Sequence, residues 1–409
     1  MAFETGSSSR NTITEAQHRL AQVDGLRGFA LLGILVVNSQ VMASPYYAQA
    51  VADPAFSSPT DLAVRWLVAL VFETKFYLLF SFLFGYSFTL QRAAADRQQA
   101  AFVPRWLRRL AGLALLGLAH ALLFYPGDIL LPYALLGLLL LGWRHLRPER
   151  ALRRAGWVLG LLAVPWLLLS VLSLMQPWAG ADFSVYEAQA QVAIASYRGD
   201  VASTVMQNLR DWRGSVWWQL MLVQGPFVVV MFLVGHALGT RQALAQPWQQ
   251  PGRLRRWALM GLLPGLTGAV LYANSGQPAA DPGWRLMGFA AGLLTSPGLS
   301  LAYACAFLLA WRTRTGQRVG AWLVPAGRMA LSNYLMQSLV CAFIFTGWGL
   351  GLSAALPPLA VLGIAVGLYA LQLPLSAWWL RRHLHGPVEW GLRALTLGRW
   401  PAWRHTPAV

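Results

Sequence analysis

The stretch that decides the fold is residues 105–142, RWLRRLAGLALLGLAHALLFYPGDILLPYALLGLLLLG. An arginine-flanked apolar run carries a single histidine, His120, then reverses at a turn that ends in Asp128 and enters a second apolar run. Apolar runs of this kind predict membrane helices, here joined as a hairpin. Ionisable groups near hydrocarbon are rare and usually mark a functional site. The stretch therefore predicts a membrane fold and a first candidate site, His120 with Asp128.

The composition of the whole chain agrees with a membrane protein. Of 409 residues, 56% are hydrophobic and only 11% are charged, whereas soluble proteins carry about 25% charged residues. The net charge of +17 would suggest a nucleic-acid partner in a soluble domain. Here the arginines form short clusters between apolar runs and no nucleic-acid recognition motif is present, so membrane topology explains the charge and no nucleic acid is expected. The predicted fold class is an all-α, polytopic membrane helix bundle.

A membrane-spanning helix needs about 20 mainly apolar residues, and this rule predicts about ten transmembrane helices. The fourth is short, and with the third it forms the hairpin. The predicted spans are 26–43, 62–90, 107–125, 128–143, 154–175, 214–238, 256–273, 285–311, 320–346 and 356–380.

The arginines predict the orientation of these spans. Alternate connections hold five, five, four and three arginines, namely 91–109, 144–154, 239–256 and 312–318. Cytoplasmic loops carry the positive excess, so both termini are expected in the cytoplasm and the His120–Asp128 turn on the outside. The domains expected are a cytoplasmic segment 1–25, a transmembrane domain 26–380 with an external loop 176–213, and a cytoplasmic interfacial tail 381–409.

His120 and Asp128 have two interpretations each. Imidazole acts as a general base near neutral pH, and an aspartate that accepts from its other nitrogen fixes the tautomer. Alternatively, Asp128 caps the start of span four and His120 is a structural hydrogen-bonding group between helices. The sequence leaves both interpretations open.

Glu73 and Lys75 lie near the middle of span two. Residues two apart on a helix do not face one another, so each needs a partner from another span or a polar cavity. The alternative is a broken or re-entrant helix that lifts both residues to an interface.

Asp24 and Arg27 open span one. At a spacing of three residues they share a helix face and can pair. Alternatively, Arg27 joins Arg105, Arg108 and Arg109 in a basic cluster suited to phosphates.

Span nine carries Arg328, Asn333 and Gln337. The two amides are four residues apart and share a face, where they line a polar path or form interhelical hydrogen bonds. Arg328 is close enough to the inner surface to snorkel. No residues have the spacing of a metal site, and no glycine-rich phosphate loop is present.

Four stretches in this order are similar to a known family. They are VDGLRGFALLGI (23–34) with Asn38, KFYLLFSFLFG (75–85), His120 followed by GDIL (127–130), and GRMALSNY (327–334). They resemble the YeiB family of bacterial inner-membrane proteins, whose defining domain is one of unknown function. The resemblance runs from the first span to PVEW (387–390).

The resemblance implies an activity, because that family is grouped with the transmembrane acyltransferases. These include the lysosomal heparan glucosaminide acetyltransferase, and they share the opening Asp-x-x-Arg-Gly followed by an asparagine. It implies transfer of an acyl group, most simply acetyl, from cytoplasmic acyl-coenzyme A to an envelope or glycan acceptor outside a bacterial cytoplasmic membrane. The heparan enzyme has its catalytic histidine shortly after the first span, whereas residues 39–61 here contain none. His120 is therefore the histidine expected to take that role.

In an acyltransferase, each candidate site residue has an expected role. His120, oriented by Asp128, deprotonates the acceptor or carries the acyl group, and Asn38 or Lys75 stabilises the oxyanion. The expected coenzyme A phosphate ligands are Arg27, Arg105, Arg108, Arg109 and Arg328. The expected substrate path runs past Asp24, Glu73, Asn333 and Gln337.

Two other functions remain open. In a transporter or exporter, Glu73, Lys75 and Asp128 would bind substrate or protons in the membrane, although such proteins often show repeats and none is evident here. The third is a non-catalytic partner or assembly factor with a degenerate site. The expected partners are the lipid bilayer, acyl-coenzyme A and an envelope acceptor, with a homo-oligomer also possible.

Overall fold

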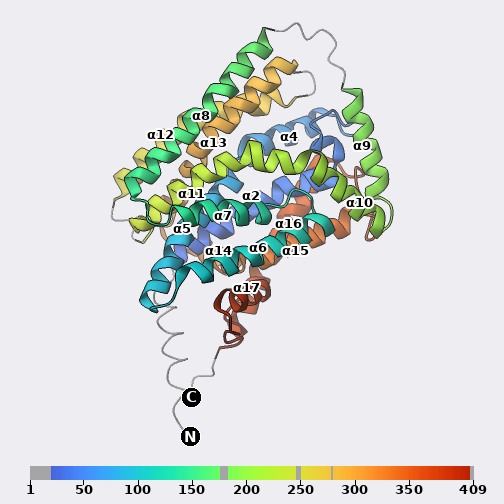
Figure 1. Cartoon of the computed structure of the whole chain (residues 1–409). Coiled ribbons are helices and arrows are strands. Elements are labelled where there is room, and N and C mark those ends of the chain that lie inside the picture. The colour runs from blue at the N-terminus through green and yellow to red at the C-terminus, as the bar shows by residue number, and fades with distance from the viewer. Residues whose placement is uncertain (1–19, 176–182, 246–249, 278–279, 406–409) are drawn as a thin grey trace.

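The computed structural model describes residues 20–175, 183–245, 250–277 and 280–405. Within these ranges the chain is helical and contains no strand, only one isolated bridge between His383 and Arg404. The prediction of an all-α polytopic helix bundle is confirmed (Figure 1).

The helices follow the apolar runs of the sequence. They are α2 (Ala21–Ala43), α3 (Pro45–Ala48), α4 (Pro59–Val71), α5 (Phe76–Arg97), α6 (Phe102–Leu123), α7 (Leu130–Gly142), α8 (Pro148–Leu174), α9 (Ser184–Tyr197), α10 (Val201–Asp211), α11 (Gly225–Thr240), α12 (Pro251–Ser275), α13 (Pro282–Ala310), α14 (Arg314–Arg328), α15 (Ala330–Phe345), α16 (Pro358–Arg382) and α17 (Pro387–Leu397). Two π-helical segments, η1 (Trp212–Val216) and η2 (Gln219–Gln224), lead into α11.

Seven helices in the described ranges are long and apolar enough to cross a membrane. They correspond to seven of the ten predicted spans, with α4 and α5 together forming one of them. The other three predicted spans differ from these seven. The fourth is the short apolar helix α7, and the seventh is α12, which is long but is not one of the seven. The ninth, 320–346, is divided between the end of α14 and the short apolar helix α15. That these three predicted spans cross the membrane stays a prediction.

The arginine-rich connections gather at one end of the bundle. Gln22 Nε2, at the start of α2, donates to the carbonyl of Leu244, just after α11, at 2.7 Å. Arg241 and Glu149, from two different arginine-rich connections, form an ion pair at 2.5 Å. Such contacts agree with the alternation on which the predicted topology depends, and the positive-inside rule assigns this end to the cytoplasm.

The connections between these arginine-rich ones meet at the opposite end, which is therefore the expected external end. The amide of Ala354 donates to the carbonyl of Ala43 at 2.6 Å, and Asn208 Nδ2 donates to the carbonyl of Leu122 at 3.0 Å. The turn between α6 and α7 lies at this end, as predicted.

The second predicted span is broken between α4 and α5. Thr74 has a φ of 66°, a left-handed conformation that is unfavourable for a threonine. Lys75 stabilises the break, because its ammonium donates to the carbonyl of Ala69 at 2.7 Å and its own carbonyl accepts from Ser300 Oγ at 2.7 Å. The predicted break in the helix is therefore present, but it does not lift the two residues to an interface, because Lys75 is fully buried and Glu73 lines a cavity.

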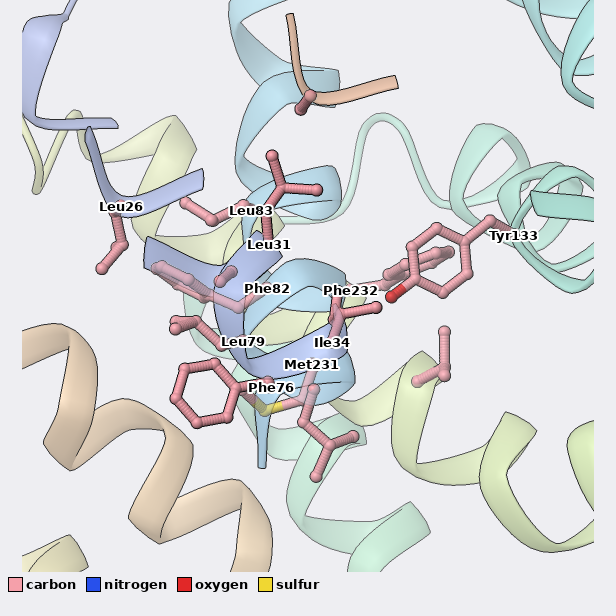
Figure 2. Packing of buried hydrophobic residues seen from close by; sticks show 14 of the residues in the cluster. Leu26, Leu31, Ile34, Phe76, Leu79, Phe82, Leu83, Tyr133, Met231 and Phe232 are labelled. Atoms are coloured by element: carbon pink, nitrogen blue, oxygen red, sulfur yellow. The ribbon is translucent and has the colours of Figure 1, made fainter. Parts of the chain in front are cut away.

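The core forms where α2, α5 and α11 pack together, and Figure 2 shows side chains from each helix, including Leu31, Phe82 and Met231. Association within a membrane depends on close packing, and glycines permit it. A Cβ on Gly85 would lie 2.2 Å from the carbonyl oxygen of Phe232, and one on Gly235 would lie 2.1 Å from that of Phe82. The α5–α11 contact is therefore made through backbone.

The C-terminal helix α17 is fixed beneath the bundle by a buried carboxylate. Glu389 accepts from the amides of Leu331 at 2.7 Å and Ser332 at 3.1 Å, and from Ser332 Oγ at 2.5 Å. These donors begin α15, so Glu389 caps that helix where α14 ends and α15 starts. The predicted interfacial tail is a helix, and it is bound to the bundle through this cap.

The α5–α11 contact gives a first prediction. Gly235→Ala should destabilise the protein by about 1 to 3 kcal/mol, because the added methyl group meets backbone that cannot yield. Gly160→Ala is the matched control, since a Cβ there meets nothing within 4 Å; alanine should raise helix stability there by about 1 kcal/mol. Thermal unfolding in detergent should show shifts of opposite sign, and shifts of the same sign would contradict the contact.

Glu389 gives a second prediction. Burial raises the pKa of its carboxyl above the ordinary value of 4.5. Above pH 4.5 the unfolded chain loses this proton while the folded chain keeps it, so the stability contributed by this group falls as pH rises to the folded pKa. The unfolding midpoint of wild type should therefore fall relative to that of Glu389→Gln over this interval. Glu187→Gln, at an exposed position, controls for loss of a carboxylate, and a midpoint difference independent of pH would contradict the assignment.

Candidate functional site

A cavity of about 750 Å³ lies in the half of the bundle that is expected to face outward. One face of α2 lines it with Gly33, Val37, Asn38 and Val41, and the α4–α5 break contributes Glu73. Six tyrosines from separate parts of the chain also line it: Tyr47, Tyr77, Tyr125, Tyr197, Tyr272 and Tyr334. Aromatic walls with a few polar groups are typical of a small-molecule site.

His120 and Asp128 are joined across the α6–α7 turn, as predicted. His120 Nδ1 lies 2.9 Å from Asp128 Oδ1, and each side chain is only 1% exposed. Gly117 permits the approach, because a Cβ there would lie 2.6 Å from Asp128 Oδ2. That second oxygen accepts from the amide of Leu131 at 2.8 Å, at the start of α7. Asp128 is therefore both a helix cap and the partner of His120, and the two interpretations hold together.

The pairing determines which imidazole nitrogen is free. A carboxylate accepts hydrogen bonds, so in the neutral imidazole Nδ1 carries the proton and Nε2 keeps its lone pair. His120 Nε2 is buried and has no hydrogen-bond partner among the residues that the structure describes. Buried polar atoms without a partner are rare and need an explanation. In the neutral imidazole, the Nε2 lone pair can accept a proton.

The His120–Asp128 pair lies behind the wall of the cavity rather than in it. The cavity lining includes neither residue but does include Tyr125, Gly127 and Tyr334. The imidazole ring lies 5.0 Å from the Tyr334 ring and 6.3 Å from the Tyr125 ring, between centroids. Two tyrosine rings therefore stand between the imidazole and the cavity.

Glu73 and Lys75 have different surroundings. The Glu73 carboxylate lines the cavity and accepts from the hydroxyl groups of Tyr272, at 2.5 Å, and Tyr47. Lys75 is fully buried, and its ammonium lies 5.5 Å from the centre of the Tyr272 ring while it donates to Ala69. Lys75 does not line the cavity, so the expected catalytic role is replaced by a structural one at the helix break.

Asn38 is placed as predicted for a group that contacts ligand. It lines the cavity and is half-buried. No other residue in the described ranges forms a hydrogen bond with its side chain, so the amide is available to a bound molecule.

The amides of span nine join helices. Asn333 Nδ2 donates to Ser376 Oγ at 3.0 Å and to the carbonyl of Ala326 at 3.1 Å, and Gln337 donates to Gln372 at 2.8 Å. Neither lines the cavity. The interhelical interpretation is confirmed, and the expected place of these amides on the substrate path is not supported.

Arg27 and Asp24 form an ion pair at 2.6 Å, and Arg27 also donates to Ser87 Oγ at 2.5 Å. The simple pairing of these two residues is thus confirmed. Arg109 lies within electrostatic range of Arg27 and of Glu389, so part of the predicted basic cluster exists.

The other predicted phosphate ligands contact different partners. Arg105 donates to Gln98 at 2.8 Å, Arg328 donates to the carbonyl of Leu384 at 3.3 Å, and Arg108 lies beside Gly398. None of the five arginines lines the cavity. Binding of coenzyme A phosphates by these five arginines stays a prediction.

Among the residues that the structure describes, no group of three His, Cys, Asp or Glu side chains could hold a metal ion. The tyrosine wall and the Glu389 cap were missed by sequence reasoning, because their partners are far apart in the chain and have no characteristic spacing.

Comparison with known proteins places the chain in a family. Residues 238–399 match the family described as "Protein of unknown function (DUF418)". The chain is 32% identical to the "Uncharacterized protein YxaH" of Bacillus subtilis (strain 168), over 96% of this chain and 98% of that protein. It is 30% identical to the "Uncharacterized protein YeiB" of Escherichia coli (strain K12), over 93% and 96%. No solved structure matches. The chain belongs to the YeiB-like DUF418 family of proteins.

Proposed function

We propose that this protein is a membrane-embedded acyltransferase that modifies an acceptor hydroxyl or amine at the external face of a bacterial cytoplasmic membrane. The observation that carries the proposal is the buried His120–Asp128 pair. Its free Nε2 lone pair, fixed tautomer and position behind an external cavity are what a general base for acyl transfer requires.

The reaction follows from the pair. As the acceptor oxygen or nitrogen forms a bond with the thioester carbonyl carbon of acyl-coenzyme A, its proton passes to His120 Nε2. Asp128 stabilises the resulting imidazolium through Nδ1–H. The carbon–sulfur bond then breaks with its electron pair on sulfur, and the proton leaves with the thiol. The acceptor becomes an ester if it is a hydroxyl and an amide if it is an amine, and the donor becomes free coenzyme A.

Other residues complete the site. Asn38 donates to the developing oxyanion, since its amide has no other partner in the described structure and faces the cavity. Glu73 and its two tyrosines hold polar groups of the acceptor. The Tyr334 and Tyr125 rings turn aside when substrate binds, because they separate His120 from the cavity.

The donor enters from the opposite side. Arg27 and Arg109 lie near each other at the cytoplasmic end, where guanidinium groups suit the coenzyme A phosphates. The external cavity does not reach these arginines, so passage of the acyl chain requires a conformational change between the two ends. Among the common acyl groups, acetyl is the smallest, so its passage requires the smallest conformational change.

Asp128→Asn tests the pairing. Asparagine still accepts from the Leu131 amide, so the cap and the stability should persist. Its amide donates to Nδ1, however, which leaves the imidazole proton on Nε2 and removes the base. The rate should fall about 10²- to 10⁴-fold, measured as thiol release from acetyl-coenzyme A by purified protein in proteoliposomes. His120→Gln should lose activity to a similar extent.

Two variants control this experiment. Asp128→Ala also removes the cap and should lower stability by about 1 kcal/mol, which separates the structural effect from the catalytic one. His236→Gln changes a histidine that contacts the carbonyl of Leu146 at 3.1 Å, away from the site, and should retain activity. Unchanged thiol release in His120→Gln would remove His120 from the mechanism.

One observation favours a second candidate, a transporter. The α4–α5 break places Glu73 at the cavity, and broken helices with ionisable groups occur at transporter binding sites. Flux of a solute across proteoliposomes without acyl-coenzyme A, lost in Glu73→Gln but kept in Asp128→Asn, would support transport and contradict the proposed reaction.

A further inference from the structure

The end of α16 and the tail that follows α17 form a second hollow, of about 450 Å³. Its aromatic side is built from Trp379, on which the His383 ring stacks at 4.1 Å, with Trp403 edge-on to that histidine at 5.0 Å. The bridge between His383 and Arg404 holds the tail against the helix end. The hollow is therefore built by residues from two separate segments.

The hollow is strongly basic. Arg381, Arg382 and Arg404 line it, and none of the described residues that line it is acidic. In the described part of the chain no carboxylate forms an ion pair with any of the three, unlike Arg27, which Asp24 neutralises. Guanidinium groups bind phosphate oxygens in a bidentate manner, so three of them around one hollow suit a phosphate group.

A positive-inside bias alone accounts for arginines at this end of a span. This bias does not explain why Arg381 and Arg382 line the same hollow as Arg404, which comes from the tail. Two other arginines at this end have side-chain partners outside the hollow: Arg241 pairs with Glu149, and Arg105 binds Gln98.

The hollow also continues an apolar stripe on α16. Leu371, Leu375 and Trp378 are 64%, 53% and 50% exposed, and their spacing places them on one helix face with Arg382. Arg382 lies over the Trp378 ring at 5.5 Å. Because α16 is apolar and long enough to span a membrane, the stripe would face lipid chains and lead to the arginines at the membrane surface.

We propose that this hollow binds the phosphate of an anionic phospholipid headgroup in the cytoplasmic leaflet, with a lipid chain along the stripe of Leu371, Leu375 and Trp378. Clusters of arginine at the cytoplasmic end of a membrane helix are suited to anionic headgroups. Soluble phosphates, including those of coenzyme A, share the headgroup chemistry but have no chain to cover the stripe. This site is separate from the proposed reaction and does not depend on it.

Thermal unfolding of the purified full chain in neutral detergent tests the proposal. Dihexanoyl phosphatidylglycerol should raise the unfolding midpoint in a saturable manner, and dihexanoyl phosphatidylcholine should raise it far less. The variant R381Q/R382Q/R404Q should bind phosphatidylglycerol at least roughly tenfold more weakly, since each arginine contributes to anionic lipid binding.

The matched control is R150Q/R255Q/R256Q, which removes the same charge from exposed positions elsewhere at the cytoplasmic end. It should bind phosphatidylglycerol like wild type. Equal binding of the two lipids, or equal weakening in the two triple variants, would overturn the proposal.

A third ligand separates the possible sources of phosphate. If coenzyme A protects the protein through these arginines while phosphatidylglycerol does not, the hollow serves a soluble phosphate and the lipid assignment is wrong. Should the glutamine variant fail to fold, R381K/R382K/R404K carries the test. This variant keeps the charge but loses the bidentate geometry. It should bind phosphatidylglycerol more weakly than wild type does, but it should still prefer phosphatidylglycerol to phosphatidylcholine.

Discussion

The carboxylate of Asp128 holds the candidate site together, because each of its two oxygens has a separate task. One starts α7 by accepting from the amide of Leu131, and the other orients the imidazole of His120. The position of the His120 imidazole is thus fixed by the same group that starts the helix. A carboxylate buried at 1% exposure is costly unless its hydrogen bonds are satisfied, and these two bonds satisfy it.

Much of this arrangement could be predicted from the sequence because it is local. His120 and Asp128 are eight residues apart around a turn, and the apolar runs on either side of this turn predict a helical hairpin. The same holds for Asp24 and Arg27, which pair across a single helical turn. Hydropathy also predicts the membrane-length helices, since each is one continuous segment.

The cavity and the arginines could not be predicted in the same way. The pairing of Glu73 with Tyr272 joins residues 199 positions apart, and hydropathy gives no information about which helices are neighbours. Arg105 and Arg109 are close in sequence yet have different surroundings, because residues four apart still depend on what packs against each. Lys75 seemed catalytic as a charge in an apolar run, but its ammonium stabilises the break by binding Ala69.

The two ends of the bundle differ in how their charges are paired. Beside the cavity, the Glu73 carboxylate accepts from two tyrosines, and the His120–Asp128 pair lies behind the cavity wall. The opposite end carries the arginine-rich connections, and the positive-inside rule assigns it to the cytoplasm. The proposed reaction, which takes its donor from one side and its acceptor from the other, requires two chemically different ends. The helix that connects the two ends is interrupted at Thr74, beside the cavity, so the Glu73 carboxylate can line the cavity from a broken helix.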